Sequence, residues 1–127
     1  MIHIPVSVGE LIDKITILSI KMTKITDEAK LRNIGFELNN LNLVLEENQY
    51  HLTPEFAELY SNLYTINLRL WMLEDDIREL TKTQDHGAKF VATAIGIHEA
   101  NDTRMKIKGM INQIYKSAIV EEKSYKE

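Results

Sequence analysis

The stretch FAELYSNLYTINLRLWMLEDDIREL, residues 56–80, decides the fold. Its apolar residues recur at alternating steps of three and four, the spacing that places side chains on one face of an α-helix. The residues on this face are Phe56, Leu59, Leu63, Ile66, Leu70, Leu73, Ile77 and Leu80. The stretch contains no glycine or proline. We therefore expect one long helix packed against neighbouring helices.

The boundaries of this helix are also marked in the sequence. Thr53 can cap it, Pro54 suits the first helical position, and the following glutamate favours the positive end of the helix dipole. The run Asp85-His86-Gly87 breaks the pattern, so the helix is predicted over 54–82 and another follows over 88–116. Their short connection favours antiparallel pairing.

Two more helices are predicted upstream. Ser7 and Glu10 form a capping box at the start of a helix over 8–24. Thr26 and Asp27 can cap a second helix over 28–48, where Gly35 predicts a close helix crossing because glycine costs about 1 kcal/mol in a helix interior. The apolar residues of that helix are Leu31, Ile34, Leu38, Leu41 and Leu45.

The whole chain is therefore predicted to be all-α. We expect a single domain over 1–127, an antiparallel bundle of three to four long helices with a short extended N-terminal arm. In the arm Ile2, Ile4 and Val6 alternate without an obvious strand partner, so we expect it to cover the bundle.

Composition excludes several classes of protein. The 127 residues include no cysteine, which excludes disulfides and thiolate metal sites. The net charge of −4 gives no basic field for nucleic acid. The start has no basic region followed by an apolar run, and no apolar stretch is long enough for a bilayer, so a cytoplasmic protein without membrane contact is expected. An acidic middle and a basic final helix are expected to attract each other.

A polar block, His98 to Arg104, interrupts the last helix. The spacing of Phe90, Ala94 and Ile97 predicts apolar residues near 101 and 104, but the chain has Asn101 and Arg104. Buried polar groups need partners. A helix neighbour should therefore supply a carboxylate for Arg104, and the candidates are Glu10, Asp13 and Asp75.

Counting outward from the turn at 85–87 places polar residues of the two long helices opposite each other. Glu74 should lie near His98, and Asn67 or Leu68 near Arg104. Either these groups form a salt-bridge network that fixes helix register, or they bind a phosphate, a metal or a small acid. The candidate ligand-binding residues are Glu74, Asp75, Asp76, Arg78, His98, Asn101, Asp102 and Arg104.

Two carboxylate pairs offer an alternative metal site. Glu10 with Asp13 and Glu99 with Asp102 each lie on one helical face, and two such pairs could hold Mg²⁺. All-α nucleoside triphosphate pyrophosphatases use this kind of arrangement, but the doubled acidic run ahead of their metal helix is absent here. No nucleophile–base spacing indicates a catalytic residue, and no cofactor other than this Mg²⁺ is suggested.

Both ends of the chain resemble one family. The opening IPVSVGELIDKITIL, residues 4–18, and the closing VEEKSY, residues 120–125, are similar to those of small, uncharacterised, all-helical bacterial and phage proteins. The likeness continues through 70–78 and 101–104. It implies no known activity, but it selects the same polar clusters as the spacing does. Thr103 stands where that pattern suggests a second arginine, which leaves one cation fewer for an anion.

Two function classes follow. The first is a non-catalytic interaction or scaffold module that self-associates, with a dimer as the expected form, since the long helix carries apolar residues beyond its main face. These residues are Tyr60, Tyr64, Leu68, Trp71 and Met72. The alternative is a binder of a divalent metal and phosphate, or a pyrophosphatase-like enzyme, that uses the helix carboxylates.

Overall fold

A computed structural model describes residues 1–124 and 126, and in this part of the chain it contains helices and no strand. The elements are α1 (Val8–Lys24), α2 (Glu28–Asn48), the 3₁₀ turn η1 (Tyr50–Leu52), α3 (Phe56–Lys82) and α4 (Ala88–Ile114). The all-α prediction is confirmed. The first two helices have the predicted bounds, α3 begins two residues late, and α4 ends two residues early.

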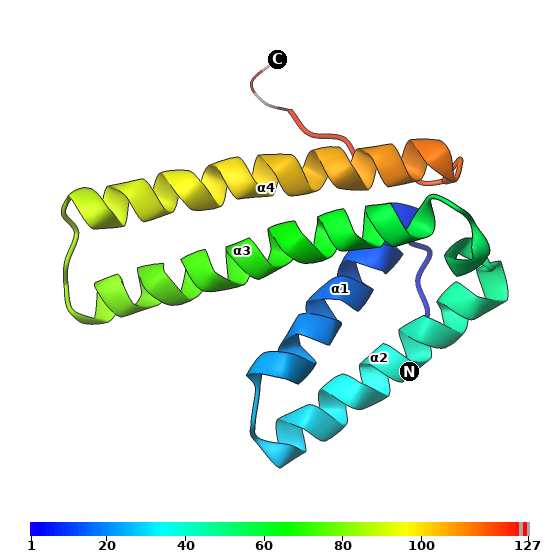
Figure 1. Cartoon of the computed structure of the whole chain (residues 1–127), viewed down its shortest axis with the longest axis horizontal. Coiled ribbons are helices and arrows are strands. Elements are labelled where there is room, and N and C mark those ends of the chain that lie inside the picture. The colour runs from blue at the N-terminus through cyan, green and yellow to red at the C-terminus, as the bar shows by residue number, and fades with distance from the viewer. Residues whose placement is uncertain (125, 127) are drawn as a thin grey trace.

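The helices form two hairpins (Figure 1). α3 and α4 run side by side over their whole length, and the α1–α2 hairpin slants away from them. α1 is the central helix because its backbone lies close to α2, α3 and α4, whereas the backbone of α2 comes close only to α1 and η1 among the described elements. The main core therefore forms around the first half of α1. Its buried residues are Val8, Leu11, Ile12, Ile15, Leu45, Leu59, Leu63 and Ile111.

The close helix approach occurs at Gly9, not at the predicted Gly35. A Cβ on Gly9 would lie 2.7 Å from the backbone oxygen of Lys108 and 2.9 Å from Asn112 Oδ1. A Cβ on Gly35 would meet no described atom of another element within 4 Å. The expectation for Gly35 is wrong because α2 has a neighbour on one side only, and Gly9 instead lets α1 touch the backbone of α4.

Thr53 does not cap α3 through its side chain. Its hydroxyl donates to the Tyr50 carbonyl at 2.7 Å and lies 2.6 Å from the Tyr115 hydroxyl. No side chain of the described residues caps the first turn of α3. The Thr53 hydroxyl therefore joins η1 to the end of α4, and the predicted side-chain cap is wrong.

The N-terminal arm does not cover the bundle. Ile2 is 90% exposed and Ile4 is 71% exposed, so the expected packing of the arm is wrong for the isolated chain.

No helix in the described residues is long and apolar enough to span a bilayer.

Candidate functional site

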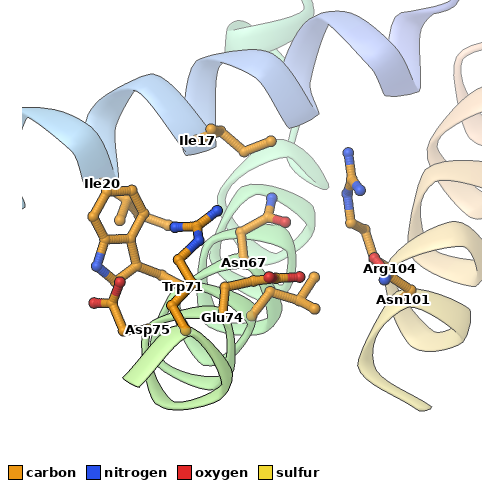
Figure 2. Close-up of a pocket in the computed structure, with 10 residues that line it drawn as sticks. Ile17, Ile20, Asn67, Trp71, Glu74, Asp75, Asn101 and Arg104 are labelled. Atoms are coloured by element: carbon orange, nitrogen blue, oxygen red, sulfur yellow. The ribbon is translucent and has the colours of Figure 1, made fainter. Parts of the chain in front are cut away.

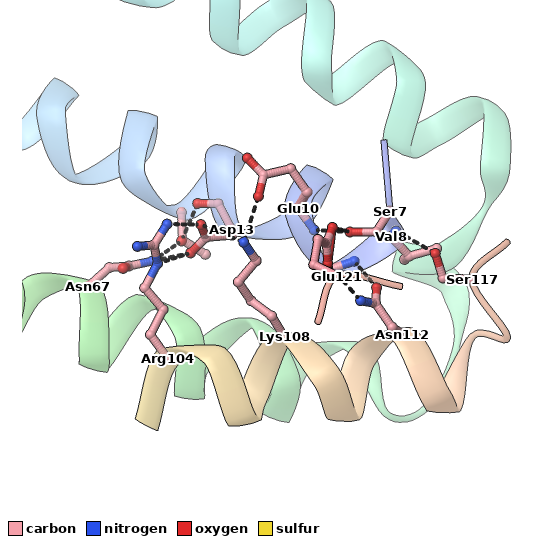
Figure 3. A network of polar contacts seen from close by, with 12 residues as sticks. Ser7, Val8, Glu10, Asp13, Asn67, Arg104, Lys108, Asn112, Ser117 and Glu121 are labelled. Carbon is pink, nitrogen blue, oxygen red and sulfur yellow. Dashed lines mark hydrogen bonds and ion pairs between the residues drawn. The ribbon is translucent and has the colours of Figure 1, made fainter. Parts of the chain in front are cut away.

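A fully buried carboxylate organises the polar interior (Figure 3). The Asp13 side chain is 0% exposed, and it accepts two hydrogen bonds from Arg104. Arg104 Nε lies 3.0 Å from Oδ1, and Nη2 lies 2.5 Å from Oδ2. Asn67 Nδ2 adds a third hydrogen bond at 2.8 Å to Oδ1. The prediction that a carboxylate from another helix pairs with Arg104 is confirmed, and Asn67 lies beside the pair as expected.

A second ion pair lies one helical turn away. Lys108 Nζ is 2.6 Å from Glu10 Oε2 and 3.8 Å from Asp13 Oδ2. The two carboxylates are three residues apart on α1 and the two cations four apart on α4, so each pair lies on one helix face. Because the helices run antiparallel, both ion pairs form at once. The two positive and two negative charges cancel within the interior.

These contacts change the pKa of Arg104. Its hydrogen bonds to Asp13 raise the pKa above the ordinary value, and the negative charges of Asp13 and Glu10 add to this against the opposing effect of burial. Arg104 therefore stays charged throughout the accessible pH range. The geometry is a bidentate guanidinium–carboxylate pair, a strong form of charge-assisted hydrogen bond.

The last part of the chain satisfies the first turn of α1. Val8 N donates to Ser117 Oγ at 3.1 Å, and Gly9 N donates to Asn112 Oδ1 at 2.7 Å. Glu10 N donates to Ser7 Oγ at 3.0 Å, which confirms that half of the capping box. The Glu10 carboxylate binds Lys108. Three of the four amides that a helix start leaves without partners are thus satisfied by side chains.

Glu121 ties the C-terminal segment to the same place. Ser7 Oγ donates to Glu121 Oε1, and Asn112 Nδ2 donates to Oε2 at 3.2 Å. Burial raises the pKa of Glu121, but hydrogen bonds from Ser7, its own amide and Asn112, with the charge of Lys108, outweigh this and lower its pKa overall. The two family-like ends of the sequence therefore meet in space, although Tyr125 of the closing string lies outside the described residues.

An open pocket of about 260 Å³ lies beside Arg104, between α1, α3 and α4 (Figure 2). It is lined by Ile17, Ile20, Asn67, Leu70, Trp71, Glu74, Asp75, Arg78, Asn101 and Arg104. Five of the eight candidate ligand-binding residues are in this set. Glu74, Asp75 and Arg78 form no ion pair with any described residue. We call this cavity the Trp71 pocket.

The other three candidates lie elsewhere. His98 Nε2 pairs with Asp102 Oδ2 of its own helix at 3.6 Å, and both line a second hollow with Asn101, Arg104, Met105 and Lys123. Asp76 is exposed and lines neither cavity. Glu74 and His98, which were expected to lie near each other, line different cavities, and no ion pair joins them among the described residues.

The four carboxylates considered for Mg²⁺ are not assembled. Glu10 and Asp13 are engaged by Lys108 and Arg104, whereas Glu99 is exposed. Among the residues that the structure describes, no three histidine, aspartate or glutamate side chains come close enough together to hold a metal ion.

The predicted attraction between the acidic middle and the basic final helix takes a different form. The interior cations of α4 pair with α1, and no ion pair joins α4 to α3 among the described residues.

Lys108, Asn112 and Ser117 were not identified from sequence. The spacing of Arg104, Lys108 and Asn112 at steps of four was the available signal, since it places all three on one face of α4.

These features define an all-α four-helix protein whose first and last helices are joined by buried ion pairs. Residues 2–127 match DUF6165, a family of unknown function, and the chain belongs to this family. No curated protein and no solved structure matches the chain.

Proposed function

We propose that the chain is a self-associating helical interaction module that pairs with a second copy through α2 and the N-terminal arm. The main support is surface area. The molecule exposes 8785 Å², whereas a compact monomer of this mass exposes about 6,900 Å². The excess of about 1,900 Å² exceeds the roughly 800 Å² that each partner buries in a standard interface.

The position of α2 supports a second copy as the partner. Among the described elements, the backbone of α2 comes close only to α1 and η1, and most of its residues are exposed. Phe36 is 64% exposed and Leu43 is 56% exposed. They are seven residues apart and lie on one side of the helix, opposite Ile34 and Leu45, which are buried. An apolar stripe of this kind is typical of a helix that packs on two sides.

The arm adds a second apolar surface to the same proposal. Ile2, Ile4 and Val6 are all exposed, and their alternation suits an extended segment laid on another subunit. The apolar residues of α3 expected to drive pairing are a weaker candidate. Tyr60, Tyr64, Leu68 and Trp71 are half-buried within the chain, and only Met72 is exposed.

Sedimentation equilibrium of single variants tests the interface. Leu43→Glu places a charge in the proposed contact and should shift the protein towards monomer by at least tenfold in Kd, because an unpaired buried charge is costly. Met72→Glu is the matched control, since Met72 is 58% exposed on α3. A wild-type protein that stays monomeric at high concentration would contradict the proposal. If Met72→Glu dissociates the protein and Leu43→Glu does not, the interface lies on α3 and not on α2.

The alternative function, binding of Mg²⁺ with a phosphate compound, has less support because Glu10 and Asp13 are already paired with cations. A thermal-shift comparison of MgCl₂, inorganic phosphate and a nucleoside triphosphate tests it. Stabilisation that requires Mg²⁺ and phosphate together would favour this alternative over a purely structural role.

A further inference from the structure

The amide oxygen of Asn67 lacks a donor within the described residues. Asn67 is 5% exposed, and its nitrogen donates to Asp13 Oδ1 at 2.8 Å and to Thr16 Oγ1 at 2.9 Å. Thr16 gives its own proton to the Asp13 carbonyl, so both partners of the nitrogen are acceptors. The nitrogen and oxygen of the Asn67 amide therefore cannot be exchanged, because the oxygen would then face two acceptors. Asn67 lines the Trp71 pocket, and its oxygen is not among the enclosed side-chain atoms that lack a partner, so it stays accessible to a donor bound in the pocket.

The charges around the pocket favour a cation. Arg104 lies in the lining, but its charge is already balanced by Asp13 through two hydrogen bonds. Glu74 and Asp75 remain against the single guanidinium of Arg78, which leaves one negative charge in excess. A bound group should therefore carry positive charge and N–H donors.

The apolar part of the lining suits a short hydrocarbon chain. Ile17, Ile20 and Leu70 contribute aliphatic surface, and Trp71 contributes an aromatic ring. Figure 2 shows Trp71 and Asp75 on one side of the pocket and Arg104 with Asn101 on the other. An ammonium group near a tryptophan ring is attracted by the ring's electron density as well as by the carboxylates.

We infer that the Trp71 pocket binds a small organic cation, an aliphatic primary amine in its ammonium form. Glu74 and Asp75 balance its charge, the Asn67 oxygen accepts one of its N–H groups, and its alkyl chain packs against Trp71 and the aliphatic lining. This inference does not depend on self-association, since α1, α3 and α4 of one chain build the whole pocket.

Fluorescence titration tests the inference directly, because Trp71 is the chain's single tryptophan. The probes are butylammonium, butanol and butyrate, which share four carbons and differ in charge. Butylammonium should change the emission and bind at least tenfold more tightly than butanol. Butyrate should not bind measurably. Equal responses to all three probes, or tighter binding of butyrate, would overturn the inference.

Two neutral variants locate the binding. Asp75→Asn and Asp76→Asn remove the same charge from neighbouring exposed positions, but only Asp75 lines the pocket. The first should weaken butylammonium binding about tenfold, and the second by less than twofold. Equal losses in both variants would show only a general electrostatic attraction and would overturn the assignment. Nα-acetyl-lysinamide tests the source of the amine. If it binds much more tightly than butylammonium, the natural ligand is a lysine side chain of another protein and not a free amine.

Discussion

Asp13 is charged and fully buried, so the stability of the interior depends on its partners. Arg104 supplies two of its hydrogen bonds, and Lys108 Nζ at 3.8 Å is too far away to replace them. We predict that Arg104→Ala lowers the free energy of unfolding by about 3–5 kcal/mol, because it leaves a buried carboxylate underpaired.

Urea denaturation of Arg104→Ala measures this loss. Arg78→Ala is the control, since Arg78 is exposed and forms no ion pair with a described residue. It should change stability by less than about 0.5 kcal/mol. Arg104→Lys should recover only part of the loss, because lysine keeps the charge but lacks the bidentate fork. Unchanged stability of Arg104→Ala would refute a structural role for the ion pair.

Substitution by alanine should have opposite effects on stability at Gly9 and at Gly35. Gly9→Ala should destabilise the fold by about 1–3 kcal/mol, because the new methyl group would press on the backbone of Lys108. Gly35→Ala should stabilise it by about 0.5–1 kcal/mol, since the site is open and alanine is the better helix former. Thermal unfolding of both variants checks the pair, and the same sign in both would contradict it.

At the scale of elements, the segment after α4 acts as a clamp on the start of α1 through Glu121. Its pKa is lower in the folded protein than the ordinary value of 4.5. A lowered pKa means that the clamp contributes stability above pH 4.5 and loses it as the pH falls through the folded value. We predict that wild type is more stable than Glu121→Gln at pH 7 and that the difference vanishes in acid.

Paired denaturation curves at pH 7 and below pH 4 test the clamp, because the difference between two proteins removes the effect of the other carboxylates. Glu122→Gln is the control, since the neighbouring carboxylate accepts no hydrogen bond from a described residue. A difference that persists unchanged in acid would show that Glu121 acts without its charge.

The elements could be predicted from sequence because the caps Ser7 and Asp27 and the break at Gly87 mark their ends. The face that α4 buries could not. The expected residues Phe90, Ala94 and Ile97 are only half-buried, whereas Thr93, Gly96 and Ala100 are buried. Hydrophobic spacing gives weight to large side chains, but α4 packs its small residues against α3, where Leu73 lies close to Gly96.

The candidate site shows a similar division. The position of Arg104 on an otherwise apolar face identified it as a residue in need of a carboxylate. Spacing alone left three candidate partners for Arg104, because it does not reveal the close approach of α1 to α4 at Gly9. Lys108 was missed because a single lysine in a helix is ordinarily a surface residue, and its burial follows from the same close approach.

For the whole molecule, α2 is the element with the least support. Of its described residues only Ile34 and Leu45 are buried, and its backbone does not come close to α3 or α4. In an isolated chain α2 should therefore open locally at lower free energy than α1, which has three helical neighbours. Association through α2 would remove this difference, because a partner that binds the closed form stabilises it by mass action.

Hydrogen exchange at two protein concentrations tests this coupling. We predict that amides in the middle of α2 exchange about tenfold more slowly when the concentration is raised from well below to well above the dimer Kd. Amides of α1 near Ile12 should change much less, since their protection comes from contacts within the chain. In Leu43→Glu the α2 amides should exchange fast at both concentrations. Protection of α2 that is high and independent of concentration would mean that the helix is stable on α1 alone, and its exposed stripe would then need another explanation.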